Sequence, residues 1–309
     1  MSESIVVVCM GGLGHVQILL PLIAGLRSRG CVVHVMTHGD FQTKVESSGA
    51  FFVDLFARHS LEAVDATSIP FPSRFVTFAG TYAESVSDQI DALAPALIVY
   101  DTFTVVGPVV ARRLGVPCVN VCPNHAPVPA RMLAALRQDP RVAISAACRE
   151  AAKRLEHVYG MSGANPFSYY ETLSPYLNVY CEPAEFLDRE DRAAFEPLAF
   201  FGSLALPPRE NATIGAFPRG RPGRRIYVSF GTGGWRYFET AARSALTVIS
   251  RTLADRDVDV LVSLGHHQVP AAARTELLRP NVRIVDYVEQ WTTLEETDVF
   301  ITHHGINST

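Results

Sequence analysis

Two side chains in the first third of the chain have the types and positions that acid–base chemistry needs. His15 closes the glycine-rich stretch "GGLGH", which follows a short apolar run at residues 5–10, and Asp101 ends the apolar run "ALIVYD". A histidine accepts a proton near neutral pH, and a carboxylate that holds one ring nitrogen orients the other toward a substrate. The pair predicts a general base and its orienting partner. The alternative is local: His15 caps its turn and Asp101 caps the next helix.

The glycines before His15 permit a second interpretation, in which the loop cradles the phosphates of a dinucleotide. That fingerprint is G-x-G-x-x-G with an acidic residue about 20 positions later. Gly12 and Gly14 fit it, but Gln17 stands where the third glycine belongs, and the strand at 32–37 has no acid at its tip. The pattern therefore favours a loop that presents His15.

Apolar runs that alternate with helical patterns place these residues in a parallel α/β sheet. In a doubly wound sheet, the strand that follows the crossover lies beside the first strand, and ligands bind between their carboxyl ends. We expect the runs at 5–10 and 96–100 to be this pair, with His15 and Asp101 at one edge. The other predicted elements of this half are strands at 32–37, 117–121, 177–181 and 198–201 and helices at 81–93, 105–114 and 131–159, the last with a break near Pro140.

A change of composition predicts two domains. Proline, glycine and arginine dominate residues 206–224 and the apolar periodicity disappears, as in a linker. We expect one Rossmann-like domain at 1–205 and a second at 225–309, with strands at 226–230, 258–264, 282–287 and 299–302 and a helix at 237–253. These strands have few helices to cover them, so we expect an incomplete second domain and a carboxyl-terminally truncated chain.

Composition and charge argue against several classes of partner. The net charge of −4 offers nothing to nucleic acid or to an anionic membrane. No apolar run is long enough to span a membrane and no basic amino-terminal region precedes one, so we expect a cytoplasmic protein. The six cysteines are scattered without CxxC spacing, and we expect no metal site.

Three stretches, in order along the chain, resemble the motifs of one family. They are "GHVQILLPLIAGLRSRGCVVHVMT", "YVSFGTGGW" and "YVEQWTTLEETDVFITHHGINST". They are similar to the opening motif, the start of the donor domain and the donor-binding signature of nucleotide-sugar-dependent glycosyltransferases. The resemblance covers the whole chain and is greatest to the plant and bacterial branch that acts on small molecules, macrolides among them. It implies the GT-B fold, in which two doubly wound domains face a cleft.

The resemblance also implies a reaction. An inverting enzyme would move a sugar from a nucleoside diphosphate to a hydroxyl of a small-molecule acceptor, such as a natural product of antibiotic biosynthesis. His15 would be the base and Asp101 its partner. The nucleotide sugar is then a co-substrate, and no cofactor or metal is implied, because a glycine-rich turn that opens a helix stabilises the leaving diphosphate. The acceptor, the sugar, the choice between UDP and dTDP and the oligomeric state stay open.

The donor site follows from the resemblance residue by residue. The glycine turn after Phe230 and the last motif would hold the diphosphate, and an aromatic residue with its successors would meet the nucleobase. Glu289 stands where the family has proline, and Glu289 with Gln290 has the alternative role of opening a helix. The implied donor-binding residues are Thr232, Gly233, Tyr287, Val288, Gln290, His303, Gly305, Asn307 and Ser308.

Aromatic residues within and just after the long segment 56–80 predict an apolar acceptor pocket, although the same side chains would serve equally well as core. The predicted acceptor-binding residues are Gly14, Phe71, Phe75, Phe78 and Tyr82. An alternative function also stays open. The glutamate that the family uses to hold the ribose would follow Thr309, so the chain as given could be a pseudoenzyme or a binding protein.

Overall fold

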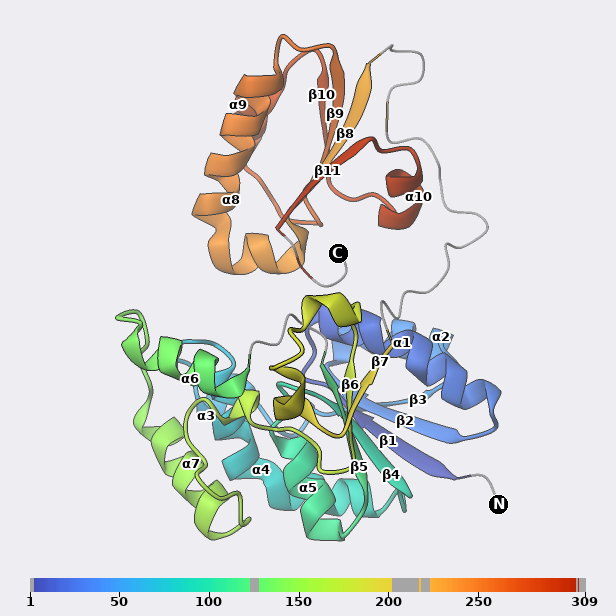
Figure 1. The fold of residues 1–309 in the computed structure, drawn as a ribbon, viewed down its shortest axis with the longest axis vertical. Coiled ribbons are helices and arrows are strands. Elements are labelled where there is room, and N and C mark those ends of the chain that lie inside the picture. The colour runs from blue at the N-terminus through green and yellow to red at the C-terminus, as the bar shows by residue number, and fades with distance from the viewer. Residues whose placement is uncertain (1–2, 123–127, 202–216, 218–222, 304, 306–309) are drawn as a thin grey trace. The chain divides into compact units, whose positions relative to one another are not determined.

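The computed structural model describes residues 3–122, 128–201, 217, 223–303 and 305 of the 309-residue chain. The chain divides into two compact units, Met1–Ala205 and Leu206–Thr309. Each is an α/β unit around a parallel sheet, as the ribbon in Figure 1 shows. The predicted linker at 206–224 lies almost entirely outside the described residues.

The first unit is built on a seven-stranded parallel sheet with the order β3-β2-β1-β4-β5-β6-β7. Its central strands are short, β-branched and fully buried, because helices cover both faces of the sheet. In β1, for example, Val6, Val7 and Val8 have no exposed surface. The strands are β1 Ser4–Val8, β2 Val32–Thr37, β3 Phe51–Asp54, β4 Leu97–Asp101, β5 Cys118–Cys122, β6 Leu177–Tyr180 and β7 Leu198–Phe200.

The helices of the first unit lie on the two faces of this sheet. In Figure 1, α1 and α2 lie on one face, and α4, α5 and α7 on the other. Helices α4 and α7 cross closely at Gly80, where an added Cβ would lie 2.6 Å from the carbonyl oxygen of Ala151. The helices are α1 Leu13–Ser28, α2 Gln42–Ser47, α3 Leu61–Val64, α4 Ser73–Asp91, α5 Val106–Leu114, α6 Pro129–Gln138 and α7 Ala146–His157.

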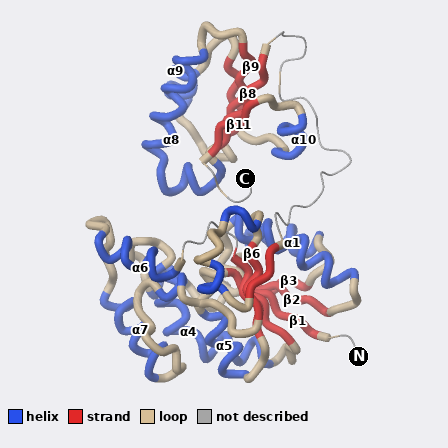
Figure 2. The backbone as a smooth tube through the Cα atoms, in the orientation of Figure 1, coloured by secondary structure: helices blue, strands red, loops and turns tan. Residues whose placement is uncertain are grey.

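The second unit has a four-stranded parallel sheet in the order β10-β9-β8-β11. Figure 2 shows its strands in red between blue helices, with α8 and α9 on one face and α10 on the other. The strands are β8 Arg224–Ser229, β9 Val258–Ser263, β10 Val282–Val285 and β11 Val299–Thr302, and the helices are α8 Gly231–Leu253, α9 Ala271–Leu277 and α10 Gln290–Glu295.

Several predicted boundaries differ from the structure. Helix α4 begins at Ser73, inside the segment predicted as loop, because its core-facing aromatics continue the helical spacing upstream. The helical stretch predicted at 131–159 with a break near Pro140 is two helices, α6 and α7, so the break is confirmed. Helix α8 begins at Gly231 rather than at 237, although Phe238 has a non-helical backbone (φ −135°, ψ 34°). Strand β3 and helix α9 were not predicted.

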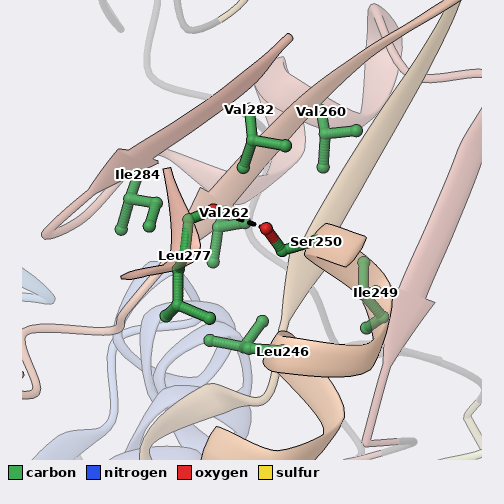
Figure 3. Close-up of a pocket in the computed structure, with 8 residues that line it drawn as sticks. All are labelled: Leu246, Ile249, Ser250, Val260, Val262, Leu277, Val282 and Ile284. Carbon is green, nitrogen blue, oxygen red and sulfur yellow. Dashed lines mark hydrogen bonds between the residues drawn. The ribbon is translucent and has the colours of Figure 1, made fainter. Parts of the chain in front are cut away.

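A small cavity of about 10 Å³ lies in the core of the second unit (Figure 3). Ser250 reaches across this region, and its hydroxyl donates to the carbonyl oxygen of Leu277 at 2.5 Å. The wall is otherwise aliphatic, so the core under α8 is not filled to the usual density. The lining residues are Leu246, Ile249, Ser250, Val260, Val262, Leu277, Val282 and Ile284.

Leu246→Ala is expected to destabilise the second unit by about 3–5 kcal/mol, near the upper end for such substitutions. Leu246 is 3% exposed, and the new void would merge with the existing cavity instead of collapsing. Denaturant unfolding measures the loss. The matched control is Val248→Ala on the same helix, because Val248 is 61% exposed, and it should change stability by no more than about 0.5 kcal/mol. Equal losses in the two variants would contradict the packing account.

Candidate active site

The topology of the first sheet brings His15 and Asp101 to one edge. Strands β1 and β4 are parallel neighbours, with Val8 opposite Tyr100, so the residues after them lie side by side. This is where the strand order reverses, because β2 lies on the other side of β1. Ligands of doubly wound sheets bind at such a switch point, beyond the carboxyl ends of the strands.

His15 and Asp101 are in direct contact. Nδ1 of His15 lies 3.2 Å from Oδ1 of Asp101, and the side chain of Asp101 is fully buried while that of His15 is 23% exposed. An ionised carboxylate can only accept, so Nδ1 carries the hydrogen and Nε2 carries the lone pair. The arrangement can therefore take a proton at Nε2 from a group that approaches from the open side.

Four donors fix the carboxylate of Asp101. Oδ1 accepts from the backbone N–H of Phe103 at 2.9 Å and from His15, while Oδ2 accepts from the backbone N–H of Met10 at 3.1 Å and from the hydroxyl of Thr104 at 2.8 Å. Burial raises the pKa of Asp101, but the neighbouring His15 and these hydrogen bonds outweigh it and hold the pKa below its ordinary value. Asp101 is thus an anion at neutral pH.

The local alternative for these two residues is realised only in part. Asp101 does brace the turn that precedes α5, but the N-cap of that helix is Val105. His15 lies in the first turn of α1, whose N-cap is Gly12, with no side-chain cap. The contact between His15 and Asp101 joins two elements far apart in sequence, which capping does not require.

The ring of Phe103 lies beside His15, and this contact was not predicted from the sequence. The ring of Phe103 lies 5.1 Å from that of His15, and the rings of Tyr169 and Tyr170 lie 5.5 and 5.9 Å from Phe103. On another side, a Cβ added at Gly12 would lie 3.0 Å from Cδ2 of His15. The base is therefore held between Phe103 and the glycine loop. The signal for Phe103 was its place two residues after the end of a buried strand.

The predicted acceptor residues divide into two groups. Phe75 is 5% exposed and Phe78 is fully buried, and both belong to the core of the first unit, which is the alternative that the sequence left open. Phe71 and Tyr82 are partly buried against that core. Gly14 lies directly before His15 in α1. Contact of these residues with an acceptor stays a prediction.

The segment before α4 is tied down by a second buried carboxylate, Asp65. Its Oδ2 accepts from the hydroxyls of Ser68 at 2.6 Å, Thr77 at 2.7 Å and Ser145 at 3.1 Å. Ser145 is also the N-cap of α7, so one carboxylate joins the segment to α4 and α7. Burial raises the pKa of Asp65, but the bonds from Ser68 and Thr77 outweigh it and leave the pKa below its ordinary value.

Asp65→Asn is expected to destabilise the first unit by about 2–3 kcal/mol at pH 7, because an amide nitrogen would replace an acceptor among hydroxyl donors. Because the folded-state pKa is lowered, the contribution of the carboxylate is present above its unfolded pKa of about 3.9 and is lost as the pH falls through the folded value. The gap in unfolding free energy should therefore narrow below about pH 4. The control is exposed Asp88→Asn on α4. A gap that stays constant with pH would contradict this account.

The second unit has its own switch point, between β8 and β11. The turn after β8 and the residues after β11 meet there: Gly231 has φ +56°, and a Cβ added to it would lie 2.6 Å from Cε1 of His303. A Cβ at Gly234 would lie 3.9 Å from Cγ of His303, and Gly305 also adjoins this ring. Two stretches that the sequence identified separately therefore form one glycine-lined corner.

Other predicted donor residues are only partly described. Positions 232 and 233 lie in the first turn of α8, where the N–H groups of a helix are available to an anion, but their side chains are not described. Asn307 and Ser308 lie outside the described residues. Their roles in donor binding stay predictions.

An exposed aromatic platform lies at the same edge of the second sheet. Tyr287 follows β10, is 52% exposed, and stacks on His266 with centroids 4.6 Å apart and planes at 6°. His266 comes from the loop after β9. Val288 packs against a small apolar cluster with Tyr227 and Leu261.

The stretch after Tyr287 opens a helix. The carboxylate of Glu289 accepts from the backbone N–H of Thr292 at 2.8 Å as the N-cap of α10, and Gln290 is the first residue of that helix. The structural alternative thus describes Glu289. The contact of Gln290 with a nucleobase stays a prediction.

Two classes of feature are not found among the described residues. No group of three or more histidine, cysteine, aspartate or glutamate side chains there could hold a metal ion. In the same part of the chain, no helix combines the length and the apolar character needed to cross a bilayer.

Comparisons with known proteins agree with this architecture, although no family model matches the chain. NDP-glycosyltransferase YjiC of Bacillus licheniformis is 22% identical over 308 residues, which are 96% of this chain and 73% of the relative. The glycosyltransferase of kitacinnamycin matches with a TM-score of 0.74 at 22% identity, over 99% of this chain and 77% of that one. Spinosyn rhamnosyltransferase SpnG, complexed with thymidine diphosphate, matches with a TM-score of 0.64 at 17% identity, over 98% and 76%.

The chain therefore has the α/β fold of the GT-B glycosyltransferases, with a parallel sheet in each of its two units. The predicted fold class is confirmed.

Proposed function

We propose that the chain is an inverting glycosyltransferase that moves a sugar from a nucleoside diphosphate to a hydroxyl of a small-molecule acceptor. The contact between His15 and Asp101 at the switch point of the first sheet carries this proposal. A histidine oriented in this way is suited to general-base catalysis, and the ring of Phe103 beside it is suited to an apolar acceptor. The related fold of SpnG, which was solved with thymidine diphosphate, supports a nucleotide donor.

The proposed chemistry is one displacement. The acceptor hydroxyl gives its proton to Nε2 of His15 while its oxygen forms a bond to the anomeric carbon. The bond from that carbon to the diphosphate oxygen breaks, and its electron pair leaves with the nucleoside diphosphate. The backbone N–H groups at the start of α8 are suited to stabilise the charge that develops there. Attack from the face opposite the leaving group inverts the anomeric centre.

The test needs no knowledge of the acceptor. Water can take the place of the acceptor hydroxyl in the proposed displacement, so the chain is incubated with α-linked dTDP-glucose and UDP-glucose. Proton NMR identifies the anomer first released, and calorimetry with dTDP and UDP measures binding. We expect the β-anomer and a preference for one nucleotide. Nucleotide binding without hydrolysis or transfer to any of a panel of phenols and macrolactones would favour the alternative of a binding protein. Release of the α-anomer would contradict inversion.

A further inference from the structure

The hydroxyl of Thr104 stands apart from the other groups on Asp101. It lies 2.8 Å from Oδ2, and the Thr104 side chain is fully buried. The donors from Met10 and Phe103 are backbone groups that any residue would supply, whereas this donor depends on the side chain at position 104. No motif or spacing in the sequence singles out Thr104.

The geometry of the carboxylate shows what this hydroxyl can do. Oδ2 is occupied by Met10 N–H and Thr104 Oγ1, so Oδ1 is the oxygen that meets His15. Without the hydroxyl, Oδ2 loses its shorter bond of 2.8 Å and keeps the longer bond of 3.1 Å from Met10 N–H, so the carboxylate is held less firmly in its present contact. The ring of His15 would then lose the fixed acceptor that selects the Nδ1–H form.

We infer that Thr104 is a positioning residue of the proposed base: its buried hydroxyl locks the Asp101 carboxylate, and through it the tautomer and orientation of His15. This rests on the proposed function for its effect on catalysis, but the effect on the His15 ring is independent of any activity. Thr104 itself touches no reacting atom. It acts through Asp101, in the way that residues hydrogen-bonded to a metal ligand fix the orientation of that ligand in metal sites.

The charged and titratable groups around the carboxylate are few. Burial and the nearby Asp101 raise the pKa of the Cys9 thiol, and burial with a smaller effect of Asp101 raises the pKa of Cys122 to about 11. Both thiols are therefore neutral at working pH. Besides these thiols, His15 is the titratable group that contacts Asp101 within the described part of the chain. A change in the pH profile therefore reports on the pair of His15 and Asp101.

The test uses Thr104→Val, which keeps the shape and removes the hydroxyl, with Thr104→Ser as the rescue. The matched control is Thr77→Val, because the Thr77 hydroxyl is also buried and donates to a buried carboxylate, Oδ2 of Asp65, at 2.7 Å. The full chain is used throughout. Ring ¹⁵N NMR at pH 8.5, with the signal assigned by His15→Gln, gives the tautomer of His15, and kcat/KM is followed against pH.

We expect the Nδ1–H form to dominate in the wild type, to give way to a mixture in Thr104→Val and to return in Thr104→Ser. We expect kcat/KM to fall about tenfold in Thr104→Val with donor KM unchanged, the size expected for one lost hydrogen bond to a charge. The acid limb should move to lower pH, because a carboxylate that is less firmly held stabilises the protonated form of His15 less.

The outcomes separate the two proposals. If the His15 tautomer is the same in Thr104→Val as in the wild type, or changes equally in Thr77→Val, this inference is overturned. If the tautomer responds as expected but the wild type has neither hydrolysis nor transfer activity, the positioning role stands and the proposed function fails.

Discussion

His15→Ala is expected to lower glycosyl transfer by about 10²–10⁴-fold while the affinity for the nucleoside diphosphate stays unchanged. The substitution removes the imidazole that is proposed to take the proton of the acceptor hydroxyl. Alanine offers Asp101 no group through which it could act on that proton. The nucleotide is expected to bind at the second unit, which the substitution does not touch. Steady-state rates with a dTDP-sugar and calorimetry with dTDP separate the two effects.

His38→Ala is the matched control for this substitution. His38 follows β2 at the same edge of the first sheet and also pairs with an acid, with Nδ1 3.2 Å from Oδ2 of Asp40. Its side chain is 49% exposed, so the pair lacks the buried, fixed carboxylate that distinguishes His15. The control should keep nearly full activity. If His15→Ala retained wild-type turnover, or if both variants lost activity equally, the assignment of the base would be wrong.

The contact between His15 and Asp101 could be predicted because topology alone determines it. The right-handed crossover rule places β4 beside β1, and residues that follow neighbouring parallel strands must share an edge. Both the ends of the two strands and the identities of the two side chains can be read directly from the sequence. Thr104 and Phe103 could not be predicted in the same way, since the direction of a side chain in a turn depends on backbone angles that no periodicity encodes.

The aromatics of α4 show a different limit of sequence reasoning. Phe75 and Phe78 have the spacing of one helix face, which serves a pocket wall and a core equally well. The choice depends on what packs against that face, and here the ring of Phe78 lies against Phe56 and Tyr82 in the core of the first unit. The start of α4 was missed for a related reason: proline residues at 70 and 72 indicate a turn, but a proline is also tolerated at the beginning of a helix.

The glycine-lined corner of the second unit joins two motifs that the sequence identified separately, and the physical link between them is steric. Strand β11 lies beside β8, and this pairing brings the ring of His303 against Gly231 in the turn after β8. Glu289 shows why single positions in such motifs transfer poorly. It replaces a residue that the family conserves in the motif, and in this chain its carboxylate serves as a helix cap.

Gly231→Ala is expected to weaken binding of the nucleoside diphosphate by at least about tenfold, the equivalent of one well-formed charge-assisted contact. The new Cβ would lie 2.6 Å from Cε1 and 3.1 Å from Nε2 of His303, so the ring must leave the corner in which the resemblance places the diphosphate. The backbone also resists, because Gly231 has φ +56°. Calorimetry with dTDP and UDP measures the affinity, and thermal unfolding measures the stability.

Gly115→Ala separates the steric effect from the backbone effect. Gly115 has φ +66° at the end of α5, but a Cβ there would meet nothing within 4 Å. Both variants should lose about 1–2 kcal/mol of stability from the left-handed backbone, and only Gly231→Ala should lose affinity. Unchanged affinity in Gly231→Ala would mean that His303 does not hold the diphosphate. Only glycine at position 231 leaves room for the ring of His303 in this corner. One methyl group added there should therefore weaken nucleotide binding more than the removal of most exposed side chains around the corner.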